Sequence, residues 1–314
     1  MDKVTVDRST CTECGRCVDI CPSNALELRE DGVALAHSDL CSECGVCQDQ
    51  CPEGSITLAS SGRMPKARDV PEGDRHWMDL SKRLTSLLGL AKAPVGIKLL
   101  RPGERAPPGF AQLTSPIRHC VSIHMASLGA ALYLPETGHA CAAAKAALGI
   151  AELPEKVRSG KVPYMHGLAS SEASAARIMK EIPKLPSGSV TGTLACPLSA
   201  CREAPDVVVL TCLPKQAMWV ANSLIFDEGG PRIAANFAGM QASCGDVTAV
   251  PVMTGKVNFS LGCYGCRSAG KLKDDEMYVG IPTARLVQVV EALYGLRRAM
   301  GMLEKSSAGP GGSK

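Results

Sequence analysis

Hydrophobic positions follow helical spacing soon after residue 76, where the segment WMDLSKRLTSLLGL places leucines three and four positions apart. This spacing predicts an amphipathic helix over 77–90. Similar apolar patterns predict helices over 119–134, 140–150, 214–226 and 283–300. Short runs of apolar and β-branched residues predict strands over 94–100, 189–198, 206–213 and 274–282. The mixture indicates the α+β class, with a larger mixed α/β domain whose topology the pattern does not fix.

Two stretches of different composition bound this larger part of the chain. Residues 61–76 are rich in Gly, Pro and charged residues and lack periodicity, so we interpret them as a linker. The tail over 304–314 is expected to be disordered because it is built from Gly, Ser and other small or polar residues. The chain therefore divides into a first domain over 1–60 and a larger cysteine-rich domain over 77–303.

The first domain contains two nearly identical runs, CTECGRCVDICP from residue 11 and CSECGVCQDQCP from residue 41, which form an internal duplication. In runs of this spacing, three cysteines wrap one face of a cubane iron–sulfur cluster and the fourth reaches the other cluster. The spacing assigns the first cluster to Cys11, Cys14, Cys17 and Cys51. It assigns the second cluster to Cys41, Cys44, Cys47 and Cys21.

Other uses of these thiols fit less well. Four-thiolate zinc would leave two thiols of each run without a role, and disulfides are rare in reducing compartments. Residues 1–60 resemble bacterial-type two-cluster ferredoxins, with every ligand position filled. The resemblance implies two [4Fe–4S] clusters, a two-fold symmetric fold of short hairpins and helices, and fast electron transfer between the clusters.

Composition narrows the compartment and the partners. The opening segment MDKVTVDR lacks the apolar core of a signal peptide, and no apolar stretch approaches the roughly 20 residues that cross a bilayer. We therefore expect a soluble cytoplasmic protein without a membrane partner. Residues 1–60 contain eleven acids and four bases, so the remainder carries 30 bases and 20 acids. An acidic first domain and an aromatic content of 4% argue against a nucleic-acid partner.

Several segments of the larger domain resemble one family. They are APVGIKLL, RHCVSIHMASLGAALYL, DVVVLTCLPKQAMWVANSLIF, ASCGDVTAVPVMTGKVNFSLGCYGCR and DDEMYVGIPTARLVQVVEAL. Together they are similar to the uncharacterised domain-of-unknown-function family 169, over roughly 80–296 and in the same order. The resemblance implies relatives in anaerobes, with or without a ferredoxin module, and it implies no particular reaction.

The larger domain holds eight more cysteines. Cys263 and Cys266 form a Cys-x2-Cys motif that could bind a metal, act as a dithiol or contribute to a cluster, and Arg267 could hold an anion. Cys244 and Cys141, from distant segments, could complete a four-thiolate site for a third iron–sulfur cluster with this pair. The competing interpretations are that some of these thiols line a substrate pocket, or that they are buried core thiols.

Further candidates come from the segment RHCVSIHM. On a helix, His124 lies four positions after Cys120 on the same face and could donate a proton. A buried structural histidine is the commoner outcome for such a residue, and His139 before Cys141 has the same status. Core packing is the favoured role for the remaining thiols, Cys196, Cys201 and Cys212.

These features predict an iron–sulfur electron-transfer protein. The first hypothesis is a redox enzyme or subunit, such as a ferredoxin-linked reductase, that passes electrons from two clusters to an acceptor site in the larger domain. Its partner would be a redox protein or a small-molecule acceptor. Two alternatives stay open: a non-enzymatic electron carrier or adaptor, and a redox or metal sensor. No Gly-x-Gly-x-x-Gly after a strand or Walker-type motif indicates a dinucleotide or nucleotide site.

Overall fold

The computed structural model describes residues 3–21, 25–29, 32–35, 38, 41, 47–48, 51–59, 74–226, 229–230 and 232–302. The expected tail and residues 61–73 of the expected linker lie outside these ranges, as does Cys44. Within them, no helix is both long enough and apolar enough to cross a membrane.

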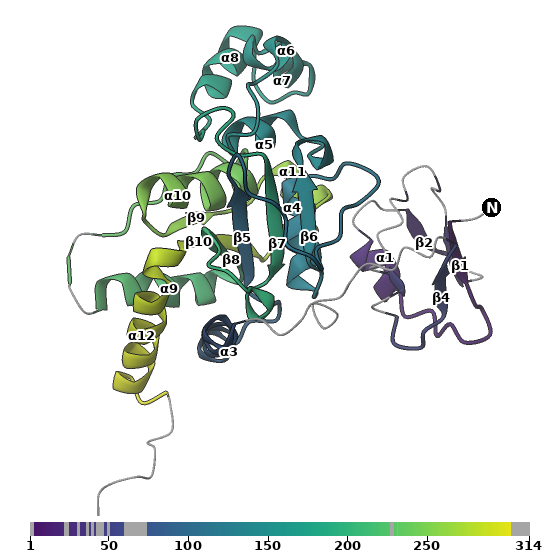
Figure 1. Cartoon of the computed structure of the whole chain (residues 1–314), viewed down its shortest axis with the longest axis horizontal. Coiled ribbons are helices and arrows are strands. Elements are labelled where there is room, and N and C mark those ends of the chain that lie inside the picture. The colour runs from purple at the N-terminus through teal and green to yellow at the C-terminus, as the bar shows by residue number, and fades with distance from the viewer. Residues whose placement is uncertain are drawn as a thin grey trace, which may run out of the picture.

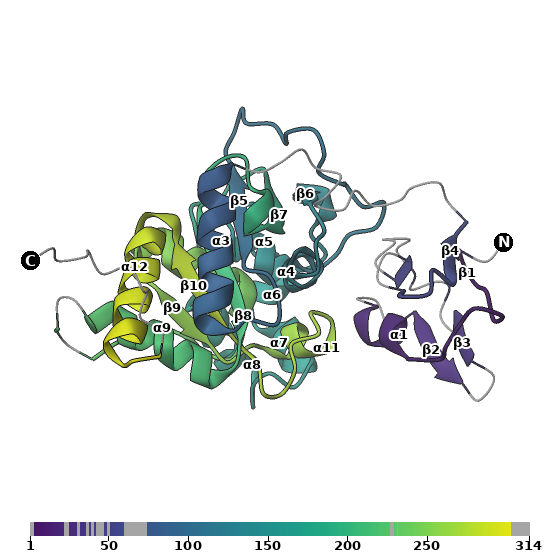
Figure 2. The same ribbon diagram turned by 90° about the horizontal axis from the view of Figure 1, so that it is seen from below.

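The described residues of the first domain include two short antiparallel strand pairs and a helix (Figures 1 and 2). Strand β1 (Val4–Val6) pairs with β4 (Ile56–Leu58), so the two ends of the domain lie side by side. Strand β2 (Leu26–Arg29) forms a hairpin with β3 (Gly32–Leu35), and α1 spans Arg16–Ile20. Its small core combines aliphatic side chains with the buried thiols of Cys17, Cys21 and Cys47. Cysteines are thus part of what this domain packs around.

The larger domain is organised by one six-stranded sheet in the order β6-β7-β5-β8-β10-β9, with every neighbouring pair of strands antiparallel. The strands are β5 (Val95–Leu100), β6 (Leu132–Pro135), β7 (Gly192–Pro197), β8 (Val207–Cys212), β9 (Asn258–Ser260) and β10 (Met277–Pro282). Every residue of β7 and β8 is buried. This explains the continuous apolar runs of these strands, because a strand that is covered on both faces does not alternate between apolar and polar residues. The α+β class is confirmed.

Helices cover both faces of the sheet (Figures 1 and 2). One face packs against α3 (Arg75–Leu88), α9 (Pro214–Phe226) and α12 (Thr283–Ala299). The other face packs against α4 (His119–Ser127), α5 (Ala142–Ala147), the π-helix η4 (Ala242–Ala249) and the neighbouring α10 (Val250–Thr254) and α11 (Tyr264–Ser268). Strand β8 alternates between the two cores, since Val207 and Val209 join one and Val208 and Leu210 the other.

The hydrophobic pattern located most of the long elements, and it was wrong over the second half of 119–134. The helix ends at Ser127, Gly129 turns the chain with a φ of 114°, and strand β6 follows. This run is almost entirely apolar, so its few polar positions do not show where helical periodicity gives way to strand periodicity. The last residues of the expected linker, Arg75 and His76, form the first turn of α3.

The pattern also missed several short elements. The helices α6 (Glu155–Arg158), α7 (Lys161–Met165) and α8 (Glu172–Lys180) pack together at the top of Figure 1 and add no strand to the sheet. The π-helix η4 was missed as well, and π-helical segments occur frequently at functional sites.

A tight backbone contact fixes η4 on the sheet. A Cβ atom added at Gly280 of β10 would lie 2.8 Å from the Cα atom of Val247 and 2.9 Å from its carbonyl carbon. Only glycine lets these two backbones approach so closely.

We predict that Gly280→Ala destabilises the larger domain by about 1–3 kcal/mol, because the added methyl group must push η4 away from β10. Urea unfolding followed by tryptophan fluorescence would measure this, since both tryptophans, Trp77 and Trp219, pack in the larger domain. Gly295→Ala in α12 is the matched control. Its new methyl group would meet only the partly exposed ring of Phe226 while favouring the helix by about 1 kcal/mol. Equal unfolding midpoints for the two variants would contradict the prediction.

Candidate functional site

Thiols of both cysteine runs meet at one pocket of the first domain. Cys11, Cys14 and Cys17 line it together with Cys51 of the second run. These are the four residues that the spacing assigned to the first cluster, and apolar side chains of Val33 and Ile56 complete the pocket. Burial raises the pKa of the Cys17 thiol, and the charges of Cys11 and Cys14 raise it further. Such crowded thiols suit an iron–sulfur cluster, whose irons bind the thiolate form.

The fourth cysteine of each run has the same local environment. The Cys21 sulfur accepts a hydrogen bond from the backbone N–H of Ala25 at 3.2 Å, and the Cys51 sulfur accepts one from Ser55 at 3.3 Å. The duplication in the sequence is therefore repeated in the structure. Hydrogen bonds to ligand sulfurs also tune the reduction potential of a bound cluster.

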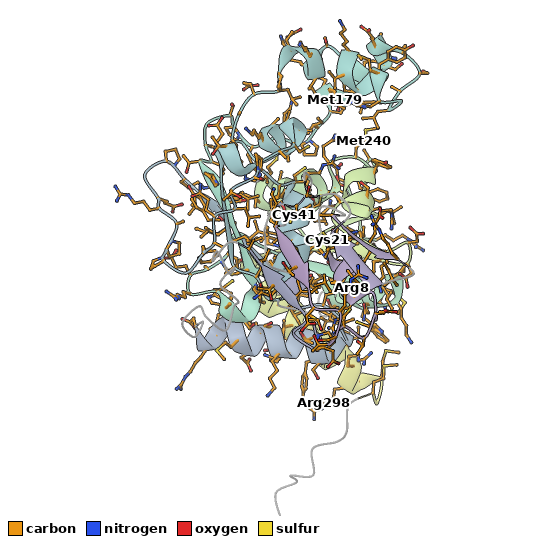
Figure 3. All side chains as sticks on the ribbon, turned by 90° about the vertical axis from the view of Figure 1, so that its right-hand side faces the viewer. Arg8, Cys21, Cys41, Met179, Met240 and Arg298 are labelled. Carbon is orange, nitrogen blue, oxygen red and sulfur yellow. The ribbon has the colours of Figure 1, made fainter. Side chains whose placement is uncertain are left out.

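The second ligand set is only partly described. Cys21 and Cys47 are buried in the core of the first domain and Cys41 packs against it, whereas Cys44 lies outside the described residues. Cys21 and Cys41 are labelled in Figure 3.

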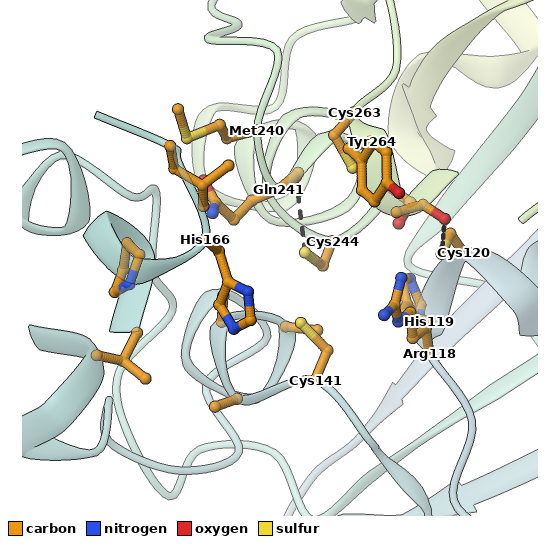
Figure 4. A pocket seen from close by; sticks show the side chains of 18 of the residues that line it. Arg118, His119, Cys120, Cys141, His166, Met240, Gln241, Cys244, Cys263 and Tyr264 are labelled. Carbon is orange, nitrogen blue, oxygen red and sulfur yellow. Dashed lines mark hydrogen bonds between the residues drawn. The ribbon is translucent and has the colours of Figure 1, made fainter. Parts of the chain in front are cut away.

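The larger domain contains a cavity of about 750 Å³ on the face of the sheet that carries α4, α5 and η4. Four cysteines from separate segments line it, namely Cys120, Cys141, Cys244 and Cys263 (Figure 4). The opposite wall comes from the group α6–α8 (Figure 1) and includes Met179, whereas Met240 lines the cavity from the main body; both methionines are labelled in Figure 3. A cavity of this size is typical of small-molecule sites.

A different element positions each thiol. Cys120 belongs to the first turn of α4, Cys141 directly precedes α5, Cys244 lies within η4, and Cys263 directly precedes α11. Burial raises the pKa of Cys244, and the charges of Cys141, Cys263 and Cys266 raise it further. The thiols that the sequence analysis grouped as a third site are therefore close enough in space to influence one another.

Cys266 lies behind Cys263 and does not line the cavity. Its side chain is fully buried, and its sulfur lies 3.3 Å from that of Cys263. The pKa of Cys266 is raised to about 11, first by its hydrogen bond with Cys120. Cys120 itself donates to the carbonyl of Gly265 at 3.4 Å.

The hydrogen bonds of Asp246 attach η4 to strand β9. Its carboxylate accepts from the Ser260 hydroxyl at 2.6 Å, and its backbone carbonyl accepts from the Asn258 amide at 2.8 Å. Burial raises the pKa of this carboxyl group to about 7. The Cys-Gly-Asp segment therefore presents Cys244 to the cavity while Asp246 holds the segment in place.

Arg267 has a structural role here and does not line the cavity. Its guanidinium donates to the carbonyls of Leu261 at 2.6 Å and Lys273 at 2.5 Å, which ties together the loop around the Cys-x2-Cys motif. The arginine that does line the cavity is Arg118. Sequence reasoning missed it, together with Tyr264, Gln241 and His166, because no local motif marks them.

Two histidines of α4 are separated by the fold. His119 lines the cavity, and its Nε2 atom lies 3.3 Å from the Thr248 hydroxyl. Burial lowers the pKa of His119 to about 3, with a further contribution from His139, so the ring is neutral. His124 is buried on α4 and does not line the cavity, so the expectation of a proton donor at that position has no geometric support.

The remaining cysteines of the larger domain lie on the other face of the sheet. Cys196, Cys201 and Cys212 are buried in the core formed with α3, α9 and α12. The sulfurs of Cys196 and Cys201 lie 3.5 Å apart, and burial raises the pKa of Cys212 to about 12. Their surroundings agree with the core-packing interpretation.

Comparisons with known proteins agree with this two-part organisation. Residues 83–292 match the domain-of-unknown-function family 169, described as uncharacterised ArCR, and residues 10–55 match a 4Fe-4S dicluster domain. The uncharacterised protein MJ0308 of Methanocaldococcus jannaschii is 31% identical over 220 residues, which cover 69% of this chain and 94% of that protein. No solved structure matches. The chain therefore belongs to domain-of-unknown-function family 169, and it carries an N-terminal iron–sulfur electron-transfer domain of the type that binds 4Fe–4S clusters.

Proposed function

We propose that this protein is a redox enzyme or enzyme subunit in which two [4Fe–4S] clusters deliver electrons to an acceptor in the thiol-lined cavity of the larger domain. The observation that carries the proposal is the meeting of four cysteines from separate segments at one cavity, in a chain that also contains a 4Fe-4S dicluster domain. A protein that served only as an electron carrier would have no use for such a cavity.

The eight cysteines of the first domain are the proposed ligands. Cys11, Cys14, Cys17 and Cys51 would hold one cluster, and Cys41, Cys44, Cys47 and Cys21 would hold the other. The shared pocket of the first set and the matching N–H···S hydrogen bonds at Cys21 and Cys51 support this assignment. When bound, the clusters supply one-electron redox chemistry.

The cavity favours an anionic acceptor. Arg118 belongs to its lining, and the described lining residues include no Asp or Glu. Apolar side chains such as Val157, Val162 and Met179 line one side, and electrostatic interactions are stronger beside such a wall than in bulk water. An arginine in such a setting suits a carboxylate or another oxyanion.

The location of donor and acceptor in one chain has a kinetic consequence. Linking two modules makes their encounter intramolecular, at an effective concentration of about millimolar for a flexible connection. The larger domain would thus be reduced by its own first domain in preference to other proteins.

The proposed crossing of ligands between the two runs predicts a specific pattern of double variants. Cys14→Ala and Cys51→Ala would remove ligands from the same cluster, so the double variant should lose about as much iron as Cys14→Ala alone. Cys14→Ala combined with Cys21→Ala should lose about twice as much, because two clusters are affected. Iron and acid-labile sulfide analysis of anaerobically prepared protein would measure the losses. The reverse pattern would show that each run binds its own cluster.

The proposed acceptor site predicts that Arg118 controls the reoxidation of the reduced protein. We expect at least one of nitrite, sulfite and oxidised glutathione to reoxidise the photoreduced wild-type protein about 10-fold or more faster than Arg118→Ala, which is the effect of losing one charge-assisted hydrogen bond. Stopped-flow absorbance of the clusters would record the rates under anaerobic conditions.

Arg285→Ala is the control for this experiment, because Arg285 is a partly exposed arginine of α12 that does not line the cavity and donates a hydrogen bond to the Gln288 side chain. It should reoxidise at the wild-type rate with every acceptor. Identical rates for the wild type and Arg118→Ala would count against an acceptor site in this cavity.

A further inference from the structure

The cysteines of the larger domain are distributed unevenly over the two faces of its sheet. Five of them, Cys120, Cys141, Cys244, Cys263 and Cys266, lie in or against the core on the face that holds the cavity. The other three lie in the apolar core of the opposite face, away from the cavity lining. If cysteine served only as a small core residue, there would be no reason for thiols to gather around this cavity.

Three of these thiols are placed to bind a common group. Cys141, Cys244 and Cys263 reach the cavity from three separate elements (Figure 4). Cys120 also lines the cavity, but its sulfur has two hydrogen-bond partners, the carbonyl of Gly265 and the sulfur of Cys266. The sulfurs of Cys244 and Cys263 have one each, the carbonyl of Gln241 at 3.6 Å and the sulfur of Cys266 at 3.3 Å. Cys266 is buried behind Cys263. The candidate ligands are therefore Cys141, Cys244 and Cys263, whereas the sequence had suggested these three together with Cys266.

The spacing of the thiols argues against a single metal ion. Among the residues that the structure describes, no three His, Cys, Asp or Glu side chains lie close enough to hold one ion. A cubane cluster requires less crowding, because each cysteine binds a different iron. The thiols of Cys11, Cys14, Cys17 and Cys51 show the same arrangement, since they surround one pocket without forming a single-ion site.

A dithiol at Cys263 and Cys266 is the competing arrangement. Their sulfurs, 3.3 Å apart, could be joined by oxidation, but such a pair would leave Cys141 and Cys244 without a role. The Cys196–Cys201 pair has nearly the same separation, 3.5 Å, in the opposite core. Close sulfur pairs thus also occur in this domain outside the lining of this cavity, and the distance by itself does not indicate function.

The charge of the cavity suits an anionic cluster. A cubane bound by thiolates carries net negative charge, and Arg118 lies at the same wall as Cys263. One guanidinium nitrogen of Arg118 comes within 3.3 Å of the position that a Cβ atom at Gly265 would occupy, which brings the cation next to the Cys-x2-Cys turn. The described lining residues contribute no carboxylate that would oppose this charge.

We propose that Cys141, Cys244 and Cys263 hold a third [4Fe–4S] cluster, and that its fourth iron faces the cavity as the binding site for a small anionic ligand with oxygen donors. Three cysteines bind three irons, so one iron has no protein thiolate. The remaining volume of the cavity and the guanidinium of Arg118 would accommodate the ligand. The role of this cluster as the electron acceptor rests on the proposed function, whereas its presence does not.

Iron and acid-labile sulfide analysis of the anaerobically reconstituted full chain tests the proposal. We expect about twelve irons per chain for three clusters, against about eight for the first domain alone. Cys141→Ala, Cys244→Ala and Cys263→Ala should each lower the count to about eight. Cys266→Ala and the matched control Cys212→Ala, a buried thiol of the opposite core, should leave it at about twelve.

An electron paramagnetic resonance experiment tests the open iron. Cyanide added to the reduced protein should change the spectrum of the third cluster and leave the signals of the first domain unchanged. Those unchanged signals, together with wild-type tryptophan fluorescence, would show that a variant has folded. Cys244→Ser provides a second variant for the case in which Cys244→Ala is unstable.

Several outcomes would overturn the proposal. They are about eight irons in the wild type, one tightly bound zinc in place of iron, or an equal loss of iron in Cys266→Ala and Cys244→Ala, which would indicate a closed four-thiolate site. The result is independent of the reoxidation experiment. About eight irons together with slow reoxidation of Arg118→Ala would reject the third cluster and retain the acceptor site. About twelve irons together with unchanged reoxidation of Arg118→Ala would retain the third cluster and reject the acceptor site.

Discussion

The close contact between η4 and strand β10 determines where the chemistry of the larger domain can lie. Gly280 lets the two backbones touch, and Asp246 fixes the other side of η4 through Ser260 and Asn258 of β9. With η4 held at both sides, Cys244 has one position relative to the sheet and points toward the cavity (Figure 4). The segment is wound as a π-helix, a form that occurs frequently at functional sites.

Cysteine has two different roles on the two faces of one sheet. On the face covered by α3, α9 and α12 it fills a close-packed apolar core as a small hydrophobic side chain. On the other face the thiols surround a cavity and raise one another's pKa, so that deprotonation requires a compensating positive charge. The first domain resembles the second case, with thiols of distant segments gathered at a pocket. The residue type alone does not distinguish the roles, whereas the surroundings do.

Sequence reasoning succeeded where information is local. The spacing of the two cysteine runs identified the first domain, and the patterns of α9, β8 and α12 gave their positions closely. It failed where period or orientation depends on tertiary packing, as for β6 within an apolar run. The grouping of Cys141, Cys244 and Cys263 was anticipated from residue type, but their shared cavity, the burial of Cys266 and the role of Arg118 depend on elements far apart in the chain. His124 does not line the cavity, because helical spacing placed it near Cys120 and could not show which neighbours surround the helix.

The helices α6, α7 and α8 supply one wall of the cavity without contributing a strand to the sheet or any of its thiols (Figure 1). Evolution could therefore lengthen, shorten or exchange this segment among relatives while the sulfur-bearing elements stay the same. A family built in this way can diversify the molecules it accepts and conserve a single type of chemistry, and variation over 155–180 would be the place to look for such specialisation.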